Sequence, residues 1–327
     1  MTFADWLEET RTRFRTMGAK RGAVASANEF WVGMLRRFGR DVWNYGEPIY
    51  ERDWDVLLVL DACRVDLMRE VAFEEGERFP FLDPDFEVFD SAASMSAEWM
   101  EKNFGEEYAA EKADTAYVSG NPFTRDLDPE EFQLLDEVWR YAWDDERDLM
   151  PPRPLTDRAI QVERDLDPDR LVVHYLQPHV PFRSMPDAGF RWGDPEENFG
   201  VKDGGTGEER GPWHRLLDGD LSREQLWQGY RDNLEWVLED VALFLDNADA
   251  DTVVISSDHA NAMGEWWCYA HPDYVPIPAL KRVPWIETSA TDTEAYEPEL
   301  DLEVEEADDE ETTDDAVTDR LEALGYK

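Results

Sequence analysis

Residues 54–66, WDVLLVLDACRVD, hold an unbroken run of five apolar residues that ends at an aspartate. A run this short and this apolar is typical of a strand whose two faces are both buried, as in the centre of a parallel sheet. Asp61 would then lie at the carboxyl end of that strand. Ligands of open α/β sheets bind beyond the carboxyl ends of the strands, so Asp61 is the first candidate functional residue.

Comparable apolar runs recur along the chain, separated by segments with helical spacing. Strands are predicted at residues 87–90, 116–119, 171–176, 252–256 and 283–286. Helices are predicted at residues 97–104, 129–143 and 221–245, where apolar side chains recur every three or four positions. Strands that alternate with helices predict an α/β fold, a three-layer sandwich whose central sheet is mainly parallel.

Residues 1–50 are predicted to form a basic helical segment. Apolar residues at helical spacing indicate two helices within residues 1–45, with Asn28 as the N-cap of the second. No Asp or Glu occurs from Arg11 through Asn28, whereas five Arg or Lys do. These helices either pack on the body and pair with its carboxylates, or form a surface for peripheral contact with anionic lipid headgroups.

Two further segments depart from the alternation of strands and helices. Residues 183–220 are rich in Gly, Pro and charge and too long for an ordinary connection, so they form either a lid over the site or a surface loop. Residues 291–327 are predicted to be a flexible acidic tail with a short helix at its end.

The composition is dominated by acid: 77 Asp and Glu against 32 Lys and Arg give a net charge of −45. Such a surface repels nucleic-acid phosphates, which argues against a DNA- or RNA-binding protein. High acid content with only six Lys suggests a salt-rich cytosol, as in extreme halophiles. Two cysteines make no disulfide scaffold, and neither a signal peptide nor an apolar membrane span is recognised, so a cytoplasmic protein is expected.

Candidate functional side chains follow the other predicted strands. SAASMSAEW (91–99) comes after the second strand, HYLQPHVPF (174–182) closes another, and Ser257-Asp258-His259 closes a later one. Carboxylates and an imidazole that the fold brings together are ligands for a divalent cation. A hydroxyl beside such a cation can lose its proton and attack a phosphorus or sulfur centre.

The order of these segments resembles the alkaline phosphatase and sulfatase superfamily, in particular its sulfatase-like branch. The resemblance covers residues 50–287, also including YAHPDYVP (269–276) and VPWI (283–286), and returns in RLEALGYK (320–327). It implies an alkaline phosphatase-like catalytic domain at residues 51–290. It further implies that Asp61, Asp258 and His259 hold one divalent cation, Mn²⁺, Mg²⁺ or Zn²⁺, with Ca²⁺ also compatible and a second metal left open.

The same resemblance suggests a nucleophile and substrate-binding residues. SMSAEW is similar to the nucleophile segment of lipoteichoic acid synthase, in which Ser94 matches the attacking Thr. Ser96 is the alternative, because small gaps shift the register by two, and a turn or N-cap role for this serine cluster also stays open. His179 and His271 would contact anionic oxygens or a second metal, or be structural. Arg64 would clamp an oxyanion, or form a structural salt bridge.

Three departures from the family pattern limit the expected activity. Cys63 in DACRVD lacks the C-x-P-x-R context of formylglycine and reads as a small core residue. Ala260-Asn261 replaces the usual Gly-Glu, and no D-x-x-x-H motif is found. We therefore expect a metal-dependent hydrolase or transferase that acts on phosphate or sulfate esters through a serine.

Several alternatives remain open on the sequence alone. They are a sulfatase acting on sulfated glycans, a phosphoglycerol-type headgroup transferase, and a degenerate binding protein without turnover. The expected partner is an anionic small-molecule, glycan or lipid-headgroup ester. The sequence does not indicate an oligomeric state.

Overall fold

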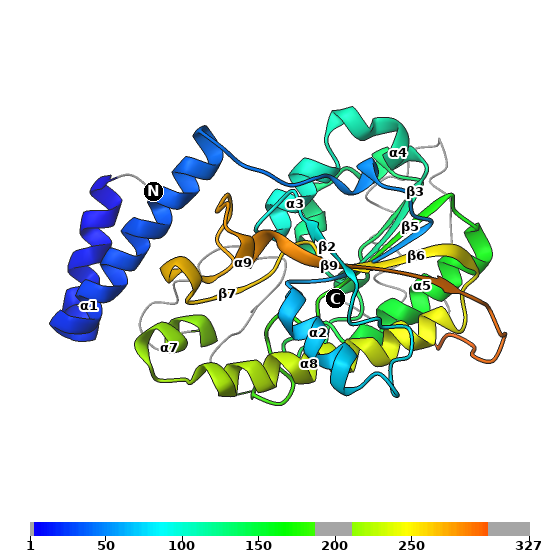
Figure 1. Ribbon diagram of the computed structural model, residues 1–327. Coiled ribbons are helices and arrows are strands. Elements are labelled where there is room, and N and C mark those ends of the chain that lie inside the picture. The colour runs from blue at the N-terminus through cyan, green and yellow to red at the C-terminus, as the bar shows by residue number, and fades with distance from the viewer. Residues whose placement is uncertain (1–2, 187–210, 300–327) are drawn as a thin grey trace.

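A seven-stranded sheet forms the centre of the computed structural model, which describes residues 3–186 and 211–299 (Figure 1). The strand order is β2-β9-β6-β1-β5-β3-β4, and only β9 runs against the others. The strands are β1 (Val56–Leu60), β2 (Glu87–Asp90), β3 (Thr115–Ser119), β4 (Leu134–Asp136), β5 (Arg170–Tyr175), β6 (Ala250–Ser256) and β9 (Arg282–Ala290). A separate pair joins β7 (Ala262–Met263) to β8 (Tyr269–Ala270).

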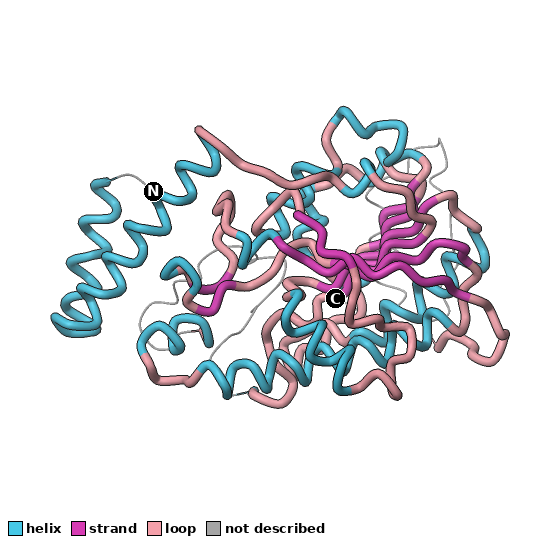
Figure 2. The backbone as a smooth tube through the Cα atoms, viewed as in Figure 1, coloured by secondary structure: helices cyan, strands magenta, loops and turns pink. Residues whose placement is uncertain are grey.

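Helices lie on both sides of this sheet (Figure 2). The helices of the described residues are α1 (Phe3–Asp41), which lies at one end of the molecule, α2 (Val65–Glu74), α3 (Ser96–Asn103), α4 (Ala109–Ala113), α5 (Pro152–Leu166), α7 (Pro212–Asp218), α8 (Arg223–Leu245) and α9 (Pro278–Lys281). Short 3-10 helices occupy Ile49–Glu51, Glu106–Tyr108, Pro122–Asp126, Pro129–Glu131, Val138–Arg140 and Glu265–Trp267.

Strand β1 explains why the sheet has a core on each face. Its five residues are all buried, and successive side chains point to opposite faces. Val56, Leu58 and Leu60 join one apolar cluster with helices α2, α5 and α8, whereas Leu57 and Val59 join a second cluster with α3 and residues 49–54. The predicted three-layer α/β sandwich with a mainly parallel sheet is therefore confirmed.

Strand register aligns the polar residues at one edge of the sheet. Val59 of β1 pairs with Ser256 of β6, so Asp61 and Asp258, each two residues further on, lie side by side. On the other side of β1, Leu60 pairs with Tyr175 of β5, and Ser119 of β3 pairs with His174. The carboxyl ends of four parallel strands therefore converge on one place.

The helix predicted at residues 129–143 is wrong. This segment contains two 3-10 turns with strand β4 between them, and β4 pairs in parallel with β3. Its apolar side chains serve both cores rather than one helix face, because Phe132 joins the cluster on one side of the sheet and Val138 joins the other. The helical spacing of these apolar residues therefore does not reflect a helix, because the segment lies at the edge of the sheet and contributes to both cores.

The predicted N-cap role of Asn28 is also wrong. The break between the two N-terminal helical halves occurs at Gly18, whose φ of +77° is readily adopted only by glycine. Asn28 lies inside the second half of α1, where its side-chain amide donates to the carbonyl of Trp267. The two halves fold back on each other as a hairpin (Figure 1), which Arg13 ties together through an ion pair with Glu29.

The hairpin's basic residues partly pair with the body, as one of the two interpretations predicted. Arg21 pairs with Asp220, and Arg36 and Arg40 both pair with Asp273. No helix of the described residues is long and apolar enough to cross a bilayer. Of the proposed lid, residues 187–210 lie outside the described part, as do residues 300–327 of the acidic tail and its terminal helix.

Candidate metal centre

Asp61, Asp258 and His259 meet at the carboxyl edge of the sheet. One potential ligand atom from each lies within 4.8 Å of the others. His259 Nε2 is 3.3 Å from Asp258 Oδ2 and 3.7 Å from Asp61 Oδ1. All three side chains are almost fully buried. The three residues are thus brought together by the strand register, although nearly two hundred positions separate Asp61 from the other two.

The two carboxylates are oriented by backbone and side-chain donors. Asp258 Oδ1 accepts from the N–H of Ala62 at 3.0 Å and of His259 at 2.8 Å. Asp61 Oδ2 accepts from the Asn121 side chain at 2.9 Å. Ala62 has a φ of +63°, a costly conformation for a residue with a side chain, which points its N–H at Asp258.

One oxygen of each carboxylate has no hydrogen-bond donor. Asp61 Oδ1 and Asp258 Oδ2 are buried, and both lie next to His259 Nε2. A buried carboxylate oxygen without a donor costs free energy, and a bound cation would remove that cost. The donor set therefore fits a divalent cation, which prefers carboxylate and imidazole ligands.

The two carboxylates also suit a cation, because their like charges disfavour ionisation in the absence of a positive charge between them. Burial and the neighbouring Asp258 raise the pKa of Asp61 well above its ordinary value, against the hydrogen bond from Asn121 that lowers it. Burial lowers the pKa of His259 to about 4, so its imidazole is neutral near pH 7. Its Nδ1 lies 3.1 Å from the Ala260 carbonyl, which only accepts, so the proton resides on Nδ1 and the Nε2 lone pair faces the carboxylates.

The two candidate serines have different surroundings. Ser96 Oγ lies 3.3 Å from His259 Nε2, whose lone pair accepts the hydroxyl proton in a hydrogen bond, so Ser96 borders the cluster. Ser94 instead points toward Glu98 Oε2 and the Pro272 carbonyl, each at 2.9 Å, and accepts from the N–H of Val275. The first choice from the sequence, Ser94, is thus engaged in holding loops together, and the alternative, Ser96, is the hydroxyl at the cluster.

The N-cap interpretation of the serine cluster is not what the structure shows. Helix α3 begins at Ser96 with Met95 as its N-cap, and no side chain caps that end. Both serines are buried, Ser94 completely and Ser96 to within 3% exposure. Their position is set by Ser91, whose hydroxyl donates to the Asp258 carbonyl and so fastens this loop to the loop that follows β6.

Two further histidines border the cluster. The ring of His271 stacks on that of His259 with a centroid separation of 4.6 Å, and its Nε2 lies 2.9 Å from His179 Nε2. Burial, with His271 and His259 nearby, lowers the pKa of His179 well below its ordinary value. His271 is only partly buried and so lies on the side of the cluster that is open to solvent.

Arg64 lies close by but is directed away from the cluster. Its guanidinium pairs with Asp66 at 2.6 Å and with Glu265 at 3.1 Å, and donates to the Asn261 carbonyl. Of its two expected roles, the salt bridge is the one present. Cys63 is fully buried in the core, as expected.

The sequence reasoning missed Asn121 and Tyr117 at the cluster, and it noted His174 at a strand end without assigning it a role. Asn121 orients Asp61, His174 Nε2 lies 3.7 Å from Asp258 Oδ2, and the hydroxyl of Tyr117 is 2.8 Å from His174 Nδ1. Burial lowers the pKa of His174 to about 4, which keeps it neutral beside Asp258. Asn121 follows the end of β3, so the strand-end rule that identified Asp61 could have identified it as well.

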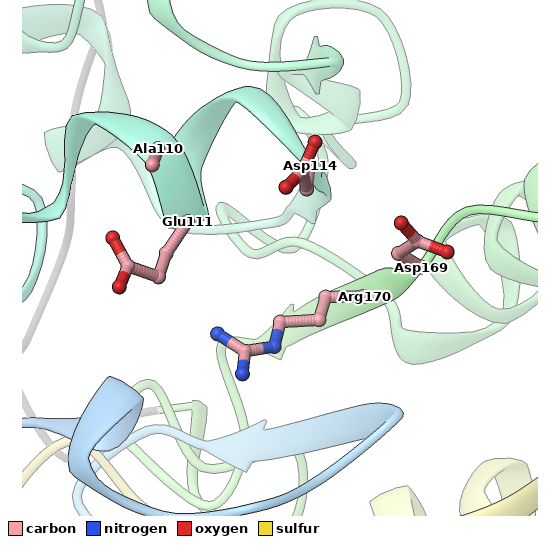
Figure 3. A pocket seen from close by; sticks show the side chains of 5 residues that line it. All are labelled: Ala110, Glu111, Asp114, Asp169 and Arg170. Atoms are coloured by element: carbon pink, nitrogen blue, oxygen red, sulfur yellow. The ribbon is translucent and has the colours of Figure 1, made fainter.

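A surface pocket elsewhere does not compete with this site. It measures about 350 Å³ and is lined by Ala110, Glu111, Asp114, Asp169 and Arg170 (Figure 3). Arg170 begins β5, so the pocket lies at the amino ends of the strands, opposite the cluster. The Arg170 guanidinium packs over Tyr50 and Trp54, at 5.4 and 5.2 Å from their ring centroids. None of the candidate residues lines it.

The sequence matches no protein-family model and no curated protein. The fold resembles lipooligosaccharide phosphoethanolamine transferase EptA from Neisseria meningitidis, with 12% identity and a TM-score of 0.45 over 88% of this chain. The chain spans 59% of that protein's length. The periplasmic domain of phosphoethanolamine transferase EptC from Campylobacter jejuni shows 15% identity and a TM-score of 0.43, covering 75% of this chain and 80% of the domain.

A shorter similarity involves YidJ of Bacteroides fragilis, named as a candidate sulfatase. It has 23% identity and a TM-score of 0.22, over 43% of this chain and 31% of YidJ. These similarities are distant, and the chemistry of this chain follows from its own side chains.

Proposed function

We propose that this protein is a divalent-cation-dependent hydrolase or transferase that acts on phosphate or sulfate esters with Ser96 as its nucleophile. The observation that supports this most directly is the arrangement of Ser96, Asp61, Asp258 and His259. One oxygen of each carboxylate has no hydrogen-bond donor and faces the neutral imidazole of His259, and the Ser96 hydroxyl lies beside them. A ligand set next to a nucleophile is what ester cleavage at a tetrahedral anionic centre requires.

In this proposal Asp61, Asp258 and His259 would hold the cation. When bound, the cation supplies positive charge that favours the ionised hydroxyl and offsets charge on the transferred group. Ser96 Oγ donates its hydrogen bond to His259 Nε2, which holds the hydroxyl beside the ligand set. Attack of Ser96 Oγ would form a bond to the phosphorus or sulfur centre while the bond to the substrate's alcohol oxygen breaks and the alcohol departs. Water in a hydrolase, or a second alcohol in a transferase, would then take the group from Ser96 and restore its hydroxyl.

His271 would face the anionic oxygens of the substrate, and His179 would orient the His271 ring. His179 Nδ1 lies 2.7 Å from the Val180 carbonyl and donates to it, which places the proton on Nδ1 and fixes the ring. Its Nε2 therefore accepts from His271 Nε2, which fixes the His271 ring beside the cluster. Because His271 is the partly exposed member, we propose that the ester enters from its side.

A metal-binding experiment tests the proposal. Titration of metal-stripped protein with Mn²⁺ or Zn²⁺ should show about one bound cation, and Asp258→Asn should weaken binding at least tenfold because a ligand charge is lost. Asp157→Asn is the matched control, since Asp157 is equally buried but bonds Tyr296 and residue 299 instead. Failure of the unaltered chain to bind either cation would refute the proposal.

Activity assays separate the alternatives. Turnover of a phosphodiester, a phosphomonoester or a sulfate ester, lost on chelation, would identify the ester class, including lipid-headgroup and sulfated-glycan substrates. Transfer of the group to an added alcohol would identify a transferase rather than a hydrolase. Stoichiometric cation binding without turnover of any of these esters would instead identify a binding protein that has lost catalysis.

A further inference from the structure

Exposed apolar side chains are concentrated in the N-terminal hairpin. Of the eleven large apolar residues that are exposed in the described part of the chain, eight lie between Leu7 and Trp43. Two of the others, Trp266 and Trp267, carry the carbonyls to which Trp31 and Asn28 of the hairpin donate. Only Phe73 lies elsewhere. An apolar surface this localised marks an interaction site.

The second half of α1 carries a continuous apolar stripe. Phe30, Met34 and Phe38 recur every four residues and are 48%, 54% and 44% exposed. Val42 and Trp43 continue the stripe past the helix end at 71% and 52% exposure, and the Trp43 ring contacts Phe38 at 6.4 Å. Residues spaced by four lie on one face of a helix, so the stripe is a single surface.

Another face of the same helix already packs on the body. Val32 and Leu35 contact the apolar cluster of Cys268, Val275 and Leu280. Gly39 approaches Tyr274 so closely that a Cβ there would lie 1.9 Å from its carbonyl oxygen. The hairpin is therefore docked in one orientation, at one end of the molecule (Figure 1). The stripe is not needed for that docking.

The charge of the hairpin is opposite to that of the chain. Residues 10–28 contain no Asp or Glu in a protein of net charge −45. Arg11, Arg15 and Lys20 are exposed and form no ion pair within the described residues. Lys20 and Phe38 are separated by about five turns of 3.6 residues, so the ammonium lies in line with the stripe. A cation in line with an apolar stripe, with two more exposed cations on the other half of the hairpin, complements a surface that is apolar inside and anionic outside.

We propose that the N-terminal hairpin lies on an anionic lipid surface. The stripe enters the boundary between headgroups and acyl chains, and Arg11, Arg15 and Lys20 contact headgroup phosphates. A second copy of the chain fits less well, because pairing two hairpins would bring their cations together.

The docking of the hairpin on the body also brings the proposed lipid surface close to the candidate site. It contacts Trp267, Asp273 and Tyr274, which flank His271 on both sides. The membrane would therefore lie near the open side of the cluster. The idea that the substrate is a lipid-headgroup ester rests on the proposed function above. The binding of the hairpin to lipid does not depend on that function.

Sedimentation of the full chain with vesicles tests the proposal. The protein should bind phosphatidylglycerol vesicles and bind phosphatidylcholine vesicles at least tenfold more weakly. Met34→Ser with Phe38→Ser should lower the partition coefficient at least tenfold, because both side chains leave the interface. Phe73→Ser is the matched control, since Phe73 is 81% exposed on α2, and it should leave binding unchanged. Neutralising Arg11, Arg15 and Lys20 to Gln should weaken binding about fivefold for each charge.

Several results would overturn the proposal. One is equal binding to both vesicle types, and another is equal loss in Phe73→Ser and in the double variant. A dimer that Met34→Ser with Phe38→Ser converts to a monomer, without vesicle binding by either protein, would assign the stripe to a second copy. Far-UV circular dichroism confirms that the variants fold. Cation binding by the same variants should be unchanged, so loss of lipid binding is distinguishable from failure of the proposed enzyme site.

Discussion

Two sets of buried carboxylates in this part of the molecule are organised in opposite ways. Glu98 of α3 has both oxygens saturated: Oε2 accepts from the N–H and hydroxyl of Ser94 and the N–H of Tyr274, and Oε1 accepts from Asn44 and Lys102. Asp61 and Asp258 each keep one oxygen without a donor. The first arrangement is complete without a ligand, and the second is not.

This contrast separates structural from functional polar residues better than burial does. Ser94 and Ser96 are both buried and both polar. The sequence favours Ser94 as the nucleophile, whereas Ser96 is the serine that lies next to the cluster. Ser94 belongs to the saturated network of Glu98, and Ser96 to the cluster with free carboxylate oxygens. We therefore expect substitutions in the Glu98 network to change stability, and substitutions at the cluster to change function.

The largest difference is expected between Ser96→Ala and Ser94→Ala. Removal of the proposed nucleophile should lower kcat by about 10³-fold or more, because the covalent step is lost. Ser94→Ala should change kcat less than about tenfold and lower the free energy of unfolding by about 1–3 kcal/mol, because it leaves buried partners unsatisfied. Steady-state kinetics and urea unfolding of both variants measure the two effects. Full activity of Ser96→Ala would exclude a covalent step at this residue.

A smaller effect is expected from Glu98→Gln. Burial alone would raise the pKa of Glu98, but hydrogen bonds from Lys102, Tyr274 and Ser94 hold it below its ordinary value. The amide nitrogen of glutamine cannot accept these bonds, so the variant should be less stable by about 1.5–3 kcal/mol near pH 7.

The pH dependence of that difference follows from the sign of the shift. The unfolded carboxyl has the higher pKa and binds its proton first as the pH falls, so the ionised Glu98 stabilises the fold above about pH 4.3 and loses this as the pH drops through its lower folded pKa. The difference in the free energy of unfolding between wild type and Glu98→Gln should therefore shrink below that pH. Glu106→Gln, an exposed carboxyl shortly after the same helix, is the control and should change stability by less than about 0.5 kcal/mol. A gap that stayed constant down to acid pH would contradict this account.

The fold could be predicted from the sequence because its central strands are continuous apolar runs. Val56–Leu60 pairs in register with two other such strands, and this register alone places Asp61 beside Asp258. Local patterns failed where tertiary contacts decided the outcome. The apolar side chains of residues 129–143 recur at helical spacing, but they pack into both cores at the edge of the sheet. The local sequence does not indicate which face of the sheet each of these side chains will contact.

The site could be predicted only as far as residues lie at strand ends. Asp258 and His259 directly follow β6, whereas the serines lie in a loop whose path depends on Ser91, Glu98 and Lys281. Lys281 is fully buried and donates to Ala92 and to Asn44 across more than 180 residues of sequence, so this loop is shaped by partners that spacing cannot identify. A shift of two residues in that loop exchanges Ser94 for Ser96.

Arg64 offers the smallest and most specific test of the contrast. The sequence suggests an oxyanion clamp, but its guanidinium is engaged by Asp66, Glu265 and the Asn261 carbonyl, which makes it a complete network like that of Glu98. Arg64→Lys keeps the charge and loses the forked geometry, so stability should fall by about 1 kcal/mol. KM for an ester substrate should stay within about threefold, because no substrate contact is lost. A rise in KM of tenfold or more with unchanged stability would mean that Arg64 leaves its carboxylates to bind the ester, and that a saturated network can still serve function.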